Sequence, residues 1–145
     1  MSRSGYSESR SGYSDDLDPQ ELNCWRGAVE SATRGKRGQA LLREMLAALD
    51  AMPVKRLIAD ELVTEGGECC ALGAVALARK VPGLENEDYD RENMAKMFDV
   101  APALAAEIMF ENDQDFSYRE ETPEQRFTHM RAWVAERIKG ASHGG

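Results

Sequence analysis

The sequence has few of the residues on which metal centres, disulfide frameworks and catalytic sites depend. It holds three cysteines and two histidines in 145 residues, and no pair has the two-residue spacing of a structural zinc site. Cys69 and Cys70 are adjacent, where a mutual disulfide would strain the backbone, so we expect reduced thiols. A phosphate-cradling glycine loop, a nucleophile elbow and an EF-hand loop are also missing. These absences favour a protein that is not an enzyme and that binds no metal or other cofactor.

Long apolar runs are missing as well. No stretch approaches the roughly 20 residues that a membrane-spanning helix requires. The N-terminus has no apolar segment of the kind found in secretory signals. We therefore expect a cytoplasmic protein that does not associate with membranes.

Helical periodicity dominates the chain from residue 18 onward. Leu22, Trp25 and Val29 share one face of an expected first helix, whose start is marked by Asp18 as N-cap and Pro19 at the first position. On this pattern Trp25 is predicted to anchor the helix in the core rather than to bind a ligand.

Gly35 and Gly38 are expected to break the chain before a second helix that ends near Met52. Pro53 then stops this helix and is expected to start a short third one over residues 54–59. The second helix is predicted from a broad apolar stripe, formed by Leu41, Leu42, Met45, Leu46, Leu49 and Met52.

The second half of the chain shows four further patterns. Residues 61–70 combine β-branched side chains with a Gly-Gly turn, which is typical of a short β-hairpin. Small apolar side chains fill residues 71–78, as in a helix buried at the centre of a domain. Two more helices are expected over residues 91–98 and 102–110, and a last one begins with a capping box at Thr122.

These elements predict a mainly α fold, a compact bundle of about six helices with the hairpin as an optional addition. A single helical domain is expected over residues 18–140. Residues 1–17 hold a tandem Ser-Arg-Ser-Gly-Tyr-Ser repeat with almost nothing to bury, so we expect a disordered tail. Residues 141–145 are expected to be disordered too.

Charge is unevenly distributed along the chain. The net charge is −8, and residues 84–125 carry 13 acidic and 3 basic side chains. Such a segment repels nucleic acid and attracts a basic protein. The plainer interpretation is a solvated face that keeps the protein soluble. The carboxylates expected to form an acidic binding face are Glu85, Glu87, Asp88, Asp90, Glu111, Asp113, Asp115, Glu120 and Glu121.

Two alternatives rest on other residues. The helices on either side of Asp99 have the packing pattern of a helix-turn-helix, but the second lacks basic or amide side chains and carries Glu107. A nucleic-acid-binding regulator would instead depend on a basic loop, formed by Arg34, Lys36, Arg37, Lys55 and Arg56. The other alternative is thiol chemistry at Cys69 or Cys70, because the dipole of the following helix lowers a thiol pKa.

Five stretches of the chain resemble small uncharacterised proteins encoded by bacteriophages and prophages. They are residues 25–29, 34–42, 70–74, 110–113 and 122–126, and the resemblance covers about residues 24–139. It carries no activity, cofactor or catalytic residue, but it implies a bacterial host cell as the setting. Some small acidic phage proteins imitate the negative surface of DNA.

We therefore expect a non-enzymatic protein-interaction module of the bacterial cytoplasm. Its acidic face would bind or inhibit a basic host protein that handles nucleic acid or acts in defence. The sequence leaves the partner's identity and the oligomeric state open.

Overall fold

The computed structural model describes residues 19–114 and 120–140, and within these ranges the regular structure is helical apart from one isolated β-bridge. The mainly α prediction is therefore confirmed. The expected tail, its N-cap Asp18 and residues 141–145 lie outside the described residues. Along the chain the elements are α1 (Pro19–Arg34), α2 (Lys36–Ala51), α3 (Ala71–Ala78), the 3-10 helix η1 (Leu84–Asn86), α4 (Arg91–Phe98), α5 (Pro102–Asp113) and α6 (Pro123–Arg137).

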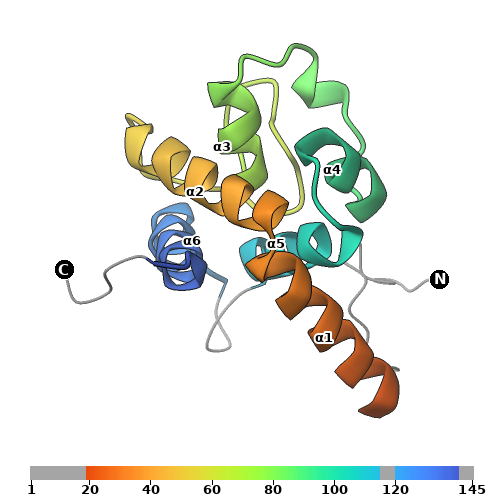
Figure 1. The fold of residues 1–145 in the computed structure, drawn as a ribbon. Coiled ribbons are helices and arrows are strands. Elements are labelled where there is room, and N and C mark those ends of the chain that lie inside the picture. The colour runs from red at the N-terminus through yellow and green to blue at the C-terminus, as the bar shows by residue number, and fades with distance from the viewer. Residues whose placement is uncertain (1–18, 115–119, 141–145) are drawn as a thin grey trace.

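Helix α2 lies across the middle of the molecule, with α3 on one side and α6 on the other (Figure 1). Most of its predicted stripe is confirmed, since Leu41, Leu42, Met45 and Leu49 are buried, whereas Leu46 and Met52 are partly buried. Burying each such side chain stabilises the fold by roughly 1.5–3 kcal/mol. This helix therefore supplies a large part of the hydrophobic core.

Helix α3 is the buried central helix that its small side chains predict. Its first six residues are all buried, and the Cys70 thiol accepts a hydrogen bond from the Gly73 N–H at its N-terminus. A Cβ at Gly73 would lie 2.1 Å from the carbonyl oxygen of Leu62. The loop before α3 can thus pass against the helix only because residue 73 has no side chain.

Helix α1 differs from the prediction. None of its residues is buried, and Trp25 is only partly covered, with the Arg91 guanidinium 5.5 Å above its ring. Figure 1 shows the reason, because the N-terminal half of α1 extends beyond the other helices. Trp25 is therefore not the core anchor that its periodicity predicts.

The two glycines near residue 36 have different roles. Gly35 separates α1 from α2, whereas Gly38 lies inside α2 and is buried. A Cβ at Gly38 would lie 2.0 Å from the carbonyl oxygen of Ala32 and 3.0 Å from the Leu104 side chain. Gly38 thus permits close packing of α1, α2 and α5 rather than a chain break.

The prediction of a short helix over residues 54–59 is wrong. This segment has no regular structure because its amides bond to distant carbonyls: Leu57 N–H donates to Pro123, and Ile58 N–H donates to Cys69. The adjoining hairpin is reduced to a single antiparallel bridge between Val63 and Cys69. Backbone pairing with the rest of the fold replaces the local helix.

Helix α6 follows the prediction closely. Thr122 and Gln125 form the expected capping box. Each side chain accepts a hydrogen bond from the backbone N–H of the other residue, which satisfies donors that a helix start leaves open. Its apolar side is buried and packs against α2; it is formed by Phe127, Met130, Val134 and Ile138. In the two described ranges no helix combines the length and apolar character needed to cross a membrane.

Candidate functional site

Three of the predicted acidic residues form a short exposed surface. Glu85 lies in η1, and Glu87 and Asp88 follow it in the loop that leads to α4. Glu92 in the first turn of α4, four residues after Asp88, is exposed as well. We call Glu85, Glu87, Asp88 and Glu92 the acidic strip. Among the residues that the structure describes, the first three carboxylates have no ion pair, and Glu92 pairs with half-buried Arg91.

The loop under the acidic strip is held by its polar side chains. The Asp90 carboxylate caps α4 by accepting a hydrogen bond from the Asn93 N–H at 2.8 Å. The Asn93 amide donates to the Glu87 carboxylate and to the Asp88 carbonyl, at 2.9 Å each. Asp90 is therefore a structural cap rather than part of a binding face.

Tyr89 holds the same loop against the end of α5. Its hydroxyl donates to Asp113 Oδ1, 3.1 Å away at the end of α5. Burial raises the pKa of Tyr89 well above its ordinary value, and the neighbouring Cys70 and Asp113 add to the shift. The phenol therefore stays protonated and remains a hydrogen-bond donor.

Asp113 was predicted on the acidic face, but it lies in a polar cluster inside the fold. Its Oδ1 accepts hydrogen bonds from the Tyr89 hydroxyl, the Asp60 N–H and the Asn112 amide. Burial raises the pKa of Asp113 to about 6, against the opposing effect of these donors. This carboxylate serves the fold and is not available to a partner.

Asn112 connects three segments beside Asp113. It is 1% exposed; its Oδ1 accepts from the Ala71 N–H at the start of α3, and its amide donates to the Ile58 carbonyl. One side chain therefore joins α3, α5 and the irregular segment before residue 60. The burial of Asn112 could have been predicted from the sequence, because Asn112 follows Leu104 and Ile108 at four-residue steps on the same helix face.

Glu111 and Glu121 also lie inside rather than on the acidic face, because both carboxylates contact His129. The two ring nitrogens of His129 are 3.0 Å from Glu111 Oε2 and from Glu121 Oε1. The side chains of Glu111, Glu121 and His129 are 15%, 7% and 11% exposed. The prediction of a continuous acidic surface through these residues is therefore wrong.

Arg126 completes this buried network. Its guanidinium donates to the carbonyls of Asn112 and Gln114 and lies 3.6 Å from Glu121 Oε1. A buried cation needs such partners, since desolvation without them costs several kcal/mol. Its place could be read from the sequence, because Arg126 shares the four-residue spacing of Met130 and Val134. Of the remaining predicted carboxylates, Glu120 is exposed and Asp115 lies outside the described residues.

The predicted basic loop is divided between two places. Arg34, Lys36 and Arg37 lie where α1 meets α2, whereas Lys55 and Arg56 follow the far end of α2. A helix of 16 residues separates the two groups by roughly 24 Å. These five residues therefore do not form one loop or one surface.

Most of these basic side chains bind groups of their own chain. Arg34 pairs with Glu30, and Arg56 pairs with Glu124. Lys55 donates to the carbonyls that end α2.

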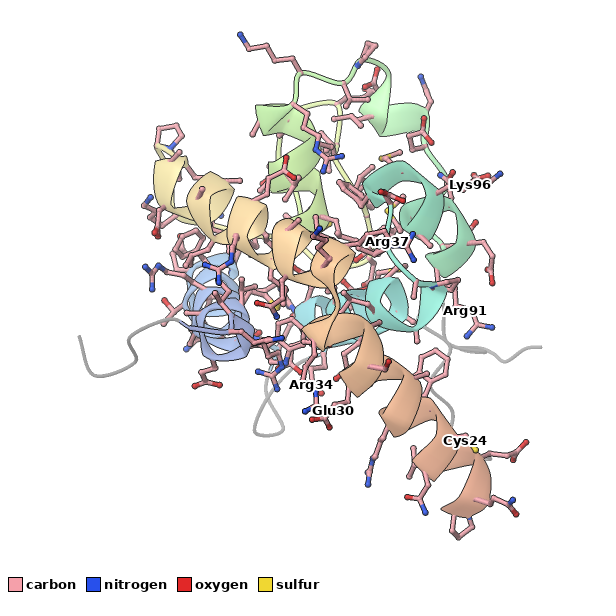
Figure 2. All side chains as sticks on the ribbon, viewed as in Figure 1. Cys24, Glu30, Arg34, Arg37, Arg91 and Lys96 are labelled. Atoms are coloured by element: carbon pink, nitrogen blue, oxygen red, sulfur yellow. The ribbon has the colours of Figure 1, made fainter. Side chains whose placement is uncertain are left out.

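Arg37 reaches across from α2 to the end of α4, where it pairs with Asp99 at 3.1 Å (Figure 2). Asp99 ends α4 in the left-handed conformation, with φ 57°. Helices α4 and α5 pack as a pair, and the start of α5 has no basic residue with which to contact DNA.

The cysteines before α3 do not have the environment of reactive thiols. Cys69 and Cys70 are both buried. Burial raises the pKa of Cys69 to about 11 and that of Cys70 to about 12, where the charge of Asp113 also contributes. The expected lowering of a thiol pKa by the helix dipole is therefore wrong. Across the described ranges no group of three or more His, Cys, Asp or Glu side chains could hold a metal ion.

Comparison with known proteins gives no relative. No family model, no curated protein and no solved structure matches this chain.

Proposed function

We propose that this protein is a non-enzymatic interaction module whose acidic strip binds a basic protein. The observation that carries the proposal is the set of exposed carboxylates at Glu85, Glu87 and Asp88, which have no ion pair among the described residues. Surface carboxylates that already form ion pairs within the protein add little to the binding of a partner. Carboxylates without an ion pair create an electrostatic field that attracts a basic partner and speeds its association.

The rigid setting of the strip supports the same function. Tyr89 and Asp90 lie within the loop and are bonded to Asp113 and to the start of α4. A loop that is already ordered loses less conformational entropy when it binds. The carboxylates are thus presented without a prior folding step.

The resemblance to phage-encoded proteins supports a bacterial cytoplasm as the setting and a host protein as the partner. A basic protein that handles nucleic acid, or a host defence complex, has the surface that an acidic strip fits. On this proposal the strip inhibits such a protein by occupying the place of DNA.

Charge reversal tests the proposal. The triple variant E85K/E87K/D88K is compared with E65K/E68K/E136K, which changes the charge equally at exposed positions of the 61–70 segment and α6. Tagged proteins are recovered from infected bacteria at low and at high salt, and the bound proteins are identified. We expect a basic protein with the parent and the control at low salt, and none with the strip variant or at high salt.

Two outcomes would contradict the proposal. A partner that binds the strip variant as well as the parent would show that the strip is not the contact. DNA recovered in place of a basic protein would favour the nucleic-acid-binding alternative, with Arg34, Lys36 and Arg37 as the remaining basic group.

A further inference from the structure

The His129 ring lies between two carboxylates that come from different parts of the fold. Glu111 belongs to the last turns of α5, and Glu121 precedes α6. Each ring nitrogen has a carboxylate oxygen at 3.0 Å. A histidine can donate from both nitrogens only when both are protonated, so this arrangement fits the imidazolium.

We propose that His129 is a pH-dependent clamp that holds the start of α6 against the end of α5. As an imidazolium the ring donates one N–H to Glu111 and the other to Glu121. When the ring loses a proton, one nitrogen becomes an acceptor that faces a carboxylate, and one of the two hydrogen bonds is lost. The clamp is therefore closed at mildly acidic pH and opens as the pH rises.

Of the charged groups around the ring, the carboxylates favour the imidazolium and Arg126, a cation, does not. On the described elements these are Glu111 from α5, Glu121 before α6, and Arg126 on α6, which lies 3.6 Å from Glu121. Helix α2 also packs on α6, and its ion pair there joins Asp50 to Arg131. Arg126 remains beside Glu121 when His129 is neutral. Loss of the ring's charge therefore removes the attraction between the imidazolium and the two carboxylates.

The direction in which the pKa of His129 is shifted agrees with this geometry. Burial lowers the pKa of His129, but the hydrogen bonds and charges of Glu111 and Glu121 raise it by more, and the net shift is upward. A group whose pKa is higher in the folded than in the unfolded state stabilises the fold below its unfolded pKa. That contribution disappears as the pH rises through the folded value.

The first test observes the ring without altering the cluster. The chain has two histidines, so the variant H143A leaves His129 as the one imidazole in the NMR spectrum. We expect its titration midpoint above 6.5, and a lower midpoint in H143A/E111Q, where one carboxylate is neutral. A midpoint at or below 6.5 in H143A would overturn the proposal, whether or not the double variant folds.

The second test follows the junction itself. Amide hydrogen exchange in the first two turns of α6, corrected for intrinsic rates, should show opening that becomes about tenfold easier for each unit by which the pKa of His129 is raised. This increase is expected as the pH rises above about 6.5 in the parent and is lost in H129N. The control D50N removes the ion pair to Arg131 and should keep the pH dependence. An increase of equal size in H129N would contradict the clamp.

Discussion

Asn112 Oδ1 accepts a hydrogen bond from the backbone N–H of Ala71, 3.0 Å away and 41 residues earlier in the chain. The contact joins the end of α5 to the start of α3, and Asn112 is buried there. Asn112 thus belongs to a hydrogen-bond network that holds α3 and α5 together.

Replacing Asn112 by alanine should therefore destabilise the protein strongly. The variant N112A leaves the Ala71 N–H and the Ile58 carbonyl without their side-chain partner in a buried place. We expect a loss of about 2–4 kcal/mol in the free energy of unfolding, measured by urea denaturation. The control N93A removes an exposed amide and should cost about 1 kcal/mol or less. Equal losses would show that burial of Asn112 is not decisive.

Two glycines in helices should respond in opposite ways to the same substitution. The variant G38A places a methyl group 2.0 Å from the Ala32 carbonyl oxygen and should destabilise by about 3 kcal/mol or more. A Cβ at Gly27 meets nothing within 4 Å, so G27A should stabilise α1 by up to about 1 kcal/mol. Thermal unfolding of both variants checks the pair. A tolerated G38A would contradict the close packing of α1 on α2.

The raised pKa of Asp113 predicts a pH dependence of stability. Burial holds this pKa at about 6 in the folded protein, above its ordinary value of 3.8. The folded state therefore binds the proton more tightly, and stability falls as the pH rises from about 4 to about 6. The contribution is about 3 kcal/mol, from two pKa units.

Comparing D113N with the parent between pH 4 and pH 7 isolates this contribution. The variant has no carboxyl to titrate, so its unfolding free energy should change less over this range by about that amount. Parallel profiles for the two proteins would show that Asp113 titrates normally.

The three cysteines should differ sharply in reactivity. Cys24 is exposed on α1 (Figure 2), whereas Cys69 and Cys70 are buried with pKa values raised to about 11 and about 12. A mild alkylating agent at neutral pH should label one thiol per native chain and three after denaturation. The variant C24S should take up no label until it unfolds. Rapid labelling of a second thiol in native protein would revive the thiol alternative.

The sequence by itself determined most of the helices. Helical periodicity depends on neighbours three and four positions apart, and those neighbours are present in the sequence. Hence the stripe of α2, the small residues of α3 and the capping box of α6 predicted what the structure contains. The net charge and its concentration in residues 84–125 were equally readable.

The tertiary structure decided how much of each helix is buried by its neighbours. The spacing of Trp25 is the same whether α1 is packed on all sides or extends from the bundle, so the sequence could not predict its partial exposure. The segment before residue 60 lost its predicted helix because Leu57 and Ile58 donate to carbonyls of Pro123 and Cys69. These partners are distant in sequence and invisible to a local pattern.

Tertiary structure also decided which carboxylates face the solvent. Glu85 and Glu111 are alike as sequence letters, yet Glu85 is exposed while Glu111 bonds His129, which lies 18 residues away. The physical reason is that a charge is buried only where a donor or an opposite charge compensates for its lost hydration. The sequence thus determined how many charges the segment carries, and the packing of α5 against α6 decided which of them a partner can reach.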